Sequence, residues 1–141
     1  MSKSLFAFFV IALMSMNVFS QGKILSKEEA DKLFGPVLVS KEIPSSTLKE
    51  LVSKSVEVIM FNIVDDDVYI LGDDRKVLLP AGLNIKSTDK YHVFSTLIVQ
   101  ELLSRGSNPT TYIEQREKVL TISNGNITLE YSWICPPICP D

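Results

Sequence analysis

Apolar residues are arranged along this chain in three ways, and each arrangement predicts a different kind of segment. The first is an unbroken apolar run, Leu5–Met14, which follows a positive charge at Lys3. The run is too short for a bilayer, which takes roughly 20 residues to span. Small and polar residues follow it and end at Ser20. We therefore predict a signal peptide over residues 1–20, cleavage after Ser20 and a secreted or periplasmic mature chain.

The second arrangement, apolar residues at helical spacing, predicts three helices. Ser26 and Thr47 each stand three residues before a glutamate, which is the spacing of a capping box. They predict short helices over 27–34 and from 48 to about 54. The longest helix is expected over 88–104. Its apolar face would be formed by Tyr91, Phe94, Ile98 and Leu102.

The third arrangement, short stretches rich in β-branched and aromatic residues, predicts strands. Val56–Val64, Val68–Leu71 and Lys76–Leu79 are separated by turns rich in aspartate. Strands of this length joined by short turns form an antiparallel meander. Residues 111–115 add a further strand, and 83–86 a short extended piece.

Near the carboxyl end, Asn124-Gly125 favours a two-residue hairpin turn between strands at 118–123 and 126–134. That turn would place Ile122 opposite Ile127 and Leu120 opposite Leu129. Because side chains alternate along a strand, one face of the hairpin is apolar and the other polar. The apolar face comprises Leu120, Ile122, Ile127, Leu129, Tyr131 and Trp133. The polar face, expected to be the wetter one, comprises Thr121, Thr128, Glu130 and Ser132.

These elements together predict an α+β fold. An antiparallel sheet of about five to six strands is built from two meanders, 56–79 and 111–134, with the helix at 88–104 packed on one face and the short helices at the N-terminus. No internal repeat or interdomain linker is visible in the sequence. Residues 21–141 are therefore expected to form a single small domain, ending in a cysteine-containing tail at 134–141.

Length and charge narrow the classes of partner. Removal of residues 1–20 leaves 121 of the 141 residues, enough for one domain with a real core. Lys3 is the only charged residue of the leader, so the mature chain carries a net charge of −4. This mild acidity, with basic residues scattered along the chain, argues against nucleic acid as a partner. No later apolar run predicts membrane insertion after cleavage.

The two cysteines, Cys135 and Cys139, enclose the sequence Pro-Pro-Ile. An exported compartment is oxidising, so we predict a disulfide between them. A fully extended segment would separate their Cα atoms by about 13 Å, whereas a disulfide needs roughly 4.4–6.8 Å. The segment must therefore bend, as a cis Pro136–Pro137 bond would allow, and we expect a strained bridge that is easily reduced. A redox-active or metal-binding dithiol and pairing with another chain remain as alternatives.

Three further groups of polar residues are candidates for chemistry. His92, the only histidine, is expected to be partly exposed on the long helix, because no Gly-x-Ser-x-Gly elbow accompanies the nearby Ser95. Glu101 is expected to pair with Arg105 four residues later, rather than to act as a buried acid. The aspartates at 65–67 and 73–74 lack the spacing of an EF-hand and are expected in solvated turns.

No nucleophile–base–acid set, phosphate loop or metal cluster is visible, so no catalytic, metal-binding or cofactor-binding residue is assigned. We expect a non-enzymatic binding protein with a protein or small-molecule partner, contacted by the wetter sheet face and the tail from Trp133. The alternative is a thiol–disulfide or metal-handling protein acting through Cys135 and Cys139. A third hypothesis is a hydrolase using Glu101 or His92. The Asn126-Ile127-Thr128 sequence also matches an N-glycosylation site.

Overall fold

The computed structural model of the chain describes residues 22–130 and 133–139. The predicted signal peptide lies outside this range, as do Tyr131 and Ser132 of the predicted last strand. Within the described ranges, no helix combines the length and the apolar character needed to cross a bilayer.

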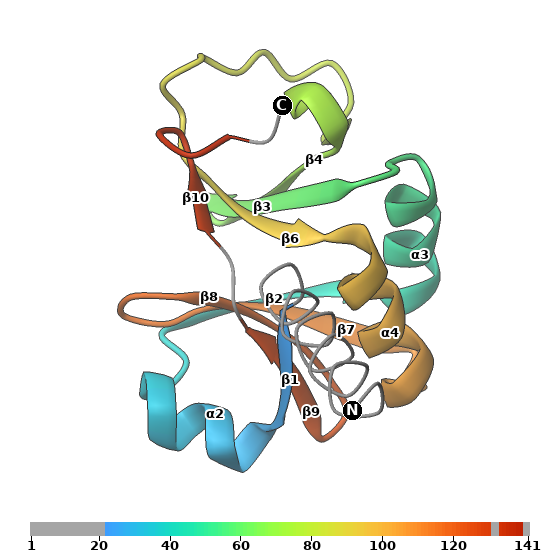
Figure 1. Ribbon diagram of the computed structural model, residues 1–141, viewed down its shortest axis with the longest axis vertical. Helices are drawn as coiled ribbons and strands as arrows, with labels where there is room; N and C mark the ends of the chain where they lie inside the picture. The colour runs from blue at the N-terminus through green and yellow to red at the C-terminus, as the bar shows by residue number, and fades with distance from the viewer. Residues whose placement is uncertain (1–21, 131–132, 140–141) are drawn as a thin grey trace, which may run out of the picture.

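The described strands form two five-stranded antiparallel sheets (Figure 1). Sheet A consists, in spatial order, of β1 (Lys23–Ser26), β9 (Ile127–Glu130), β8 (Leu120–Asn124), β7 (Thr110–Gln115) and β2 (Val39–Pro44). Sheet B consists of β10 (Trp133–Cys135), β6 (Tyr91–Ser95), β3 (Val58–Val64), β4 (Asp67–Leu71) and β5 (Val77–Leu79). The helical elements are α2 (Lys27–Phe34), α3 (Ser45–Ser53), α4 (Thr96–Gly106) and a 3-10 turn, η1 (Asp73–Arg75).

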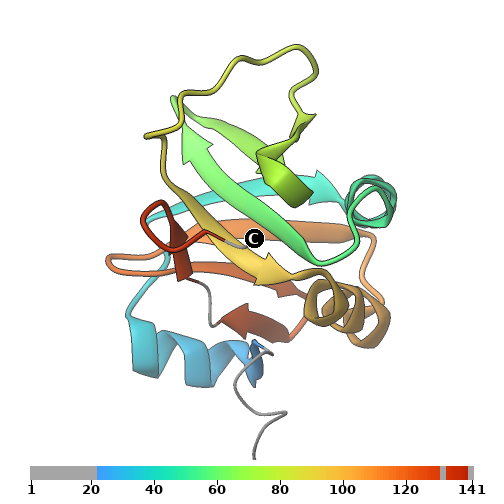
Figure 2. The same cartoon turned by 45° about the horizontal axis from the view of Figure 1, so that its top comes forward.

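The main core lies between the two sheets and is closed at one end by α3 and α4 (Figure 2). Sheet B contributes Ile59, Phe61, Ile70 and Phe94, and sheet A contributes Ile43, Ile113, Leu120, Ile122 and Leu129. The rings of Phe61 and Phe94 pack edge to face with centroids 5.7 Å apart. Because side chains alternate along each strand, the intervening residues of both sheets point outward.

The outer face of each sheet is also covered, but by different means. Sheet B carries a second apolar cluster, formed by Val58, Met60, Leu71, Tyr91, Val93 and Cys135, against which Ile85 and Trp133 pack. Sheet A carries α2, which lies below it in Figure 1, and the residues of β7, β8 and β9 that are buried on that face are polar. The prediction that the polar face of the hairpin is the wetter one is therefore wrong: Thr121 and Thr128 on it are both fully buried.

The chain order repeats, although the sequence shows no repeat. A strand, a helix and a three-stranded meander occur once as β2-α3-β3-β4-β5 and again as β6-α4-β7-β8-β9. In each unit the first strand joins the meander of the other unit, since β2 pairs with β7 and β6 pairs with β3. The two units are interlocked, so neither can complete its sheet alone.

The predicted α+β class and antiparallel pairing agree with the structure, but the single sheet and the long helix do not. The helix expected over 88–104 is divided into strand β6 and the shorter helix α4. Tyr91, Val93 and Phe94 are all at most 2% exposed, because β6 is covered on both faces. A short run that is apolar on both faces has no alternation, so its periodicity does not distinguish a strand from a helix.

The C-terminal hairpin has a different register from the one predicted. Ile122 lies opposite Leu129, and Asn124 lies opposite Ile127. The two loop residues are therefore Gly125 and Asn126, with Gly125 at a positive φ of 62°, which suits glycine in the first central position of such turns. The predicted strand also ends early, because Trp133 pairs with Val93 in sheet B.

Asn124 is a strand residue because its side chain is fully buried in a polar cluster. Its amide nitrogen donates to Ser45 Oγ and Thr111 Oγ1, each at 3.0 Å, and its amide oxygen accepts from the Asn108 backbone at 2.9 Å. The same contacts explain why α3 begins at Ser45 instead of after Thr47: Ser45 Oγ also donates to the Asn108 carbonyl at 2.6 Å. A Cβ at Gly106 would overlap the Asn124 side chain.

The turn after β4 is organised by one carboxylate. Asp73 accepts hydrogen bonds from the backbone N–H groups of Val56, Glu57 and Val58 at 2.7–3.1 Å. Burial alone would raise the pKa of this carboxyl, but the bonds from these amides and from Ser55 outweigh it and hold the pKa below its usual value. Asp73 thus joins this turn to the start of β3.

Asp73→Asn is expected to lower the free energy of unfolding at pH 7 by about 1–2 kcal/mol. An ionised acceptor makes stronger hydrogen bonds than a neutral one, but the partial exposure of this carboxylate to solvent limits the gain. A carboxylate with a depressed pKa stabilises the fold above its unfolded pKa, and this contribution is lost as the pH falls through the folded pKa. The difference between wild type and variant, measured by urea unfolding, should therefore shrink below about pH 4. The control is Asp74→Asn, because Asp74 is exposed at a positive φ of 56°; an equal loss in both variants would contradict the assignment.

Candidate functional site

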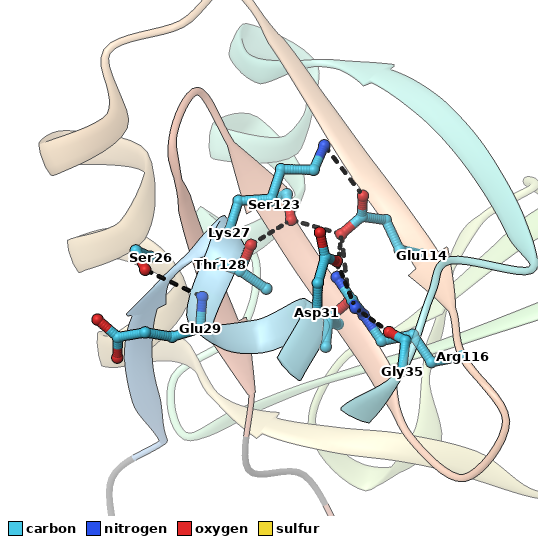
Figure 3. Close-up of polar contacts among 10 residues, drawn as sticks. Ser26, Lys27, Glu29, Asp31, Gly35, Glu114, Arg116, Ser123 and Thr128 are labelled. Atoms are coloured by element: carbon cyan, nitrogen blue, oxygen red, sulfur yellow. Dashed lines mark hydrogen bonds and ion pairs between the residues drawn. The ribbon is translucent and has the colours of Figure 1, made fainter. Parts of the chain in front are cut away.

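The outer face of sheet A carries a buried ionic network beneath α2 (Figure 3). Glu114 on β7 is 2% exposed, and Arg116, just after β7, is fully buried. They are joined by buried hydroxyl groups of the neighbouring strands, on Thr121, Ser123 and Thr128. Buried charges of this kind are rare unless they are paired, so their arrangement points to a specific role.

The sequence around α2 explains where the helix begins and ends. Ser26 Oγ accepts a hydrogen bond from the backbone N–H of Glu29 at 3.1 Å, which satisfies a free amide of the first turn. Gly35 ends the helix with a φ of 79°, a conformation that favours glycine. The backbone N–H of Lys27 donates to the Asn126 carbonyl at 2.9 Å, which fixes the start of the helix to the hairpin turn.

Arg116 connects the other end of α2 to the sheet. Its Nη1 donates to Asp31 Oδ1 at 2.8 Å and to the carbonyl of Gly35. Its Nε donates to Thr121 Oγ1 on β8 at 3.1 Å. Its Nη2 lies 3.7 Å from Glu114 Oε1 and has no hydrogen-bond partner among the described residues. The guanidinium therefore connects helix and sheet as a bracket between them, whereas Nη2 interacts with Glu114 by charge attraction and not by a hydrogen bond.

The two carboxylate oxygens of Glu114 have different surroundings. Oε1 accepts from Thr121 Oγ1 at 3.2 Å and from Ser123 Oγ, and lies closest to Arg116. The one described neighbour of Oε2 is the ammonium group of Lys27, at 3.7 Å, which is beyond hydrogen-bond distance. Lys27 is half exposed and also lies over the ring of Tyr112, 5.9 Å from its centroid. Oε2 is thus the oxygen of this network that retains accepting capacity.

A pocket of about 680 Å³ opens beside Glu114, between α2, β7 and β2. Its lining comprises Lys27, Asp31, Pro36, Val37, Ser40, Tyr112 and Glu114. A volume of this size accommodates a small molecule. The pocket thus combines a buried carboxylate, a half-exposed ammonium group and an aromatic ring, and we take it as the candidate site.

A second groove, of about 740 Å³, lies between α3 and α4. Its lining includes the exposed Ser46, Lys49, Gln100 and Ser104, and the buried Ser45. The Ser45 hydroxyl is already bonded to Asn108 and Thr111. This groove is larger, but none of its lining residues is a buried charge, so it defines no ligand chemistry.

Cys135 and Cys139 form a disulfide, as the sequence predicts. Their Cα atoms are 4.7 Å apart, a separation that a disulfide allows and that a fully extended segment would exceed. The Cys135–Pro136 and Pro136–Pro137 peptide bonds are both cis. Within the described ranges, no three histidine, cysteine, aspartate or glutamate side chains are grouped to hold a metal ion.

The other candidate residues are dispersed. The sequence predicts His92 on the long helix, but the residue lies on strand β6, so that placement is wrong. Burial lowers the pKa of its imidazole. Glu101 pairs with Arg105 at 3.5 Å, and both side chains are about half exposed. Asp65 and Asp66 form the tight turn between β3 and β4, with φ of 48° and 73°.

Sequence reasoning missed Glu114 and Arg116, the central residues of the candidate site. A weak signal was present: the polar pair Glu114-x-Arg116 faces the polar pair Thr121-x-Ser123 on the next strand, and Glu114 lies opposite Thr121. Charged residues in register with hydroxyl residues on one sheet face can indicate a buried network. The sequence contained no sign that α2 would cover that face.

Comparisons of this chain with protein-family models, with curated proteins and with solved structures found no match. The functional argument therefore depends on the site itself.

The buried pair yields a stability prediction. Arg116→Met should lower the free energy of unfolding by about 3–5 kcal/mol, because it leaves Glu114 buried without its countercharge. The double variant Arg116→Met, Glu114→Gln should lose less than the sum of the single losses, with a coupling of about 1–3 kcal/mol in a denaturant double-mutant cycle. The half-exposed pair Glu101–Arg105 is the matched control, for which coupling below about 0.5 kcal/mol is expected. Equal coupling in both cycles would contradict a special role for the buried pair.

Proposed function

We propose that this chain is a small exported binding protein, and that the pocket between α2, β7 and β2 holds a small amine. The observation that carries this proposal is Glu114 Oε2, a carboxylate oxygen on the pocket wall whose only described partner is a loosely held ammonium group. The disulfide is compatible with an oxidising compartment, where such bridges persist.

The charge of the pocket favours a cation over an anion. Its lining contains Asp31 and Glu114 as acids and Lys27 as the single base. Arg116 balances the charge of Glu114 from behind but does not line the pocket. A protonated amine would donate to Oε2, displace the half-exposed Lys27 ammonium into solvent and make a charge-assisted hydrogen bond.

The rest of the wall favours an apolar group next to the amine. The ring of Tyr112 and the side chains of Pro36 and Val37 line the same pocket as the carboxylate and offer apolar surface there. A cation close to Tyr112 would also interact with the face of its ring, as Lys27 does in this structure. A short aromatic or aliphatic amine fits these features.

Benzylamine, which is protonated at neutral pH, is a suitable probe. In an amide chemical-shift titration, it should perturb α2 and residues 112–114, with a Kd of about 1 mM, typical of a ligand of this size. Glu114→Gln should weaken binding about tenfold through loss of the charge. Lys27→Met should strengthen it, because the competing ammonium is removed.

The matched control is Glu101→Gln, which removes a half-exposed carboxylate from α4 and should leave the Kd unchanged. Benzoate has the same ring with the opposite charge and should not perturb the pocket. Binding of benzoate as tight as that of benzylamine, or benzylamine shifts located away from α2, would overturn the proposal.

A further inference from the structure

The two sulfur atoms of the Cys135–Cys139 disulfide lie in different environments. Cys135 is fully buried in the outer cluster of sheet B, whereas Cys139 is exposed. The guanidinium of Arg75 contacts the buried side of the bridge: its Nη1 lies 3.4 Å from Cys135 Sγ and 3.2 Å from the Cys135 carbonyl. The buried sulfur of the bridge therefore has a positive charge beside it, and the other sulfur faces solvent.

Arg75 is fixed in this position by neutral groups. Its Nη2 donates to the carbonyls of Lys86 and Asp89, at 3.2 and 2.8 Å, and the guanidinium lies over the ring of Tyr91, 5.4 Å from its centroid. The carboxylate of Asp89 instead accepts from the Lys86 backbone. Among the described residues, no carboxylate forms an ion pair with Arg75, so its charge remains available to the sulfur beside it.

We propose that this bridge is a thiol–disulfide exchange site that accepts two electrons from an external dithiol. A thiolate of the dithiol attacks the exposed Cys139 Sγ, and the Cys135–Cys139 bond breaks. Its electron pair goes to Cys135 Sγ, which leaves as a thiolate beside Arg75. The second thiol of the dithiol, as thiolate, then attacks the dithiol sulfur bound to Cys139. Cys139 is released as a thiolate and takes up a proton, and the dithiol leaves as a disulfide.

The direction of attack follows from access and from the leaving group. Exchange begins at the sulfur that solvent can reach, and it is faster when the departing thiol has a low pKa. Burial raises the pKa of a thiol, whereas a neighbouring arginine lowers it. Arg75 is therefore a positioning residue that makes departure of the buried sulfur feasible. This inference is independent of the amine pocket, which lies on the other sheet.

Two measurements test the role of Arg75. In reduced Cys139→Ser, which isolates Cys135, the thiolate absorbance at 240 nm should titrate below about 8.5, the ordinary thiol value. Arg75→Met in the same background should raise that midpoint by about 1–2 units. In the wild-type bridge, Arg75→Met should slow reduction by dithiothreitol about tenfold, and Arg75→Lys, which keeps the charge, should restore part of the rate.

Arg105→Met removes an arginine that pairs with Glu101 on α4 and serves as the control, with a wild-type rate expected. The proposal is overturned if Arg75→Met leaves both the titration midpoint and the reduction rate unchanged. It is also overturned if Arg75→Met and Arg75→Lys accelerate reduction equally, because Arg75 would then only hold the bridge closed. The proposal is equally excluded if the thiolate of Cys135 titrates with a midpoint above about 8.5 and Arg75→Met does not alter that midpoint.

Discussion

The fully buried guanidinium of Arg116 is the constraint on which the outer layer of sheet A depends. It bonds to Asp31 and Gly35 at the end of α2 and to Thr121 on the sheet, so that helix and sheet share one charged group. Apolar packing alone would not set the position of α2, because Ala30 is its only buried residue. The same guanidinium balances Glu114 and so allows a carboxylate to remain on the wall of a pocket.

The two faces of sheet A are stabilised in different ways, although both arise from one alternating pattern of side chains. Ile113, Leu120 and Ile122 point into the core between the sheets, where burial of apolar surface stabilises the interlocked strands. The residues between them point outward and form the ionic network. A strand that is apolar on one face and polar on the other can therefore be buried on both sides, provided that the polar groups satisfy one another.

The sequence predicts much of the fold, where local signals decide. The strand predicted over 56–64 is found at 58–64, and the aspartates expected to end it form the turn to the next strand. These features and the α+β class follow from β-branched stretches and turn residues. The predictions fail where distant contacts decide. Strand β6 is apolar on both faces because two layers cover it, and Asn124 is drawn into the strand by Ser45, 79 positions earlier. Arg116 meets Asp31 across 85 positions, so its burial had no local signature.

Native-state hydrogen exchange on wild type and Arg116→Met tests the central role of the bracket most directly. If Arg116 fixes α2 to the sheet, the amides of residues 27–34 in the variant should lose at least about tenfold of their protection as a group. Those of β3 and β4, in the other sheet, should change together and only by the global loss of stability. Unchanged protection of α2 relative to β3 and β4 would contradict the account.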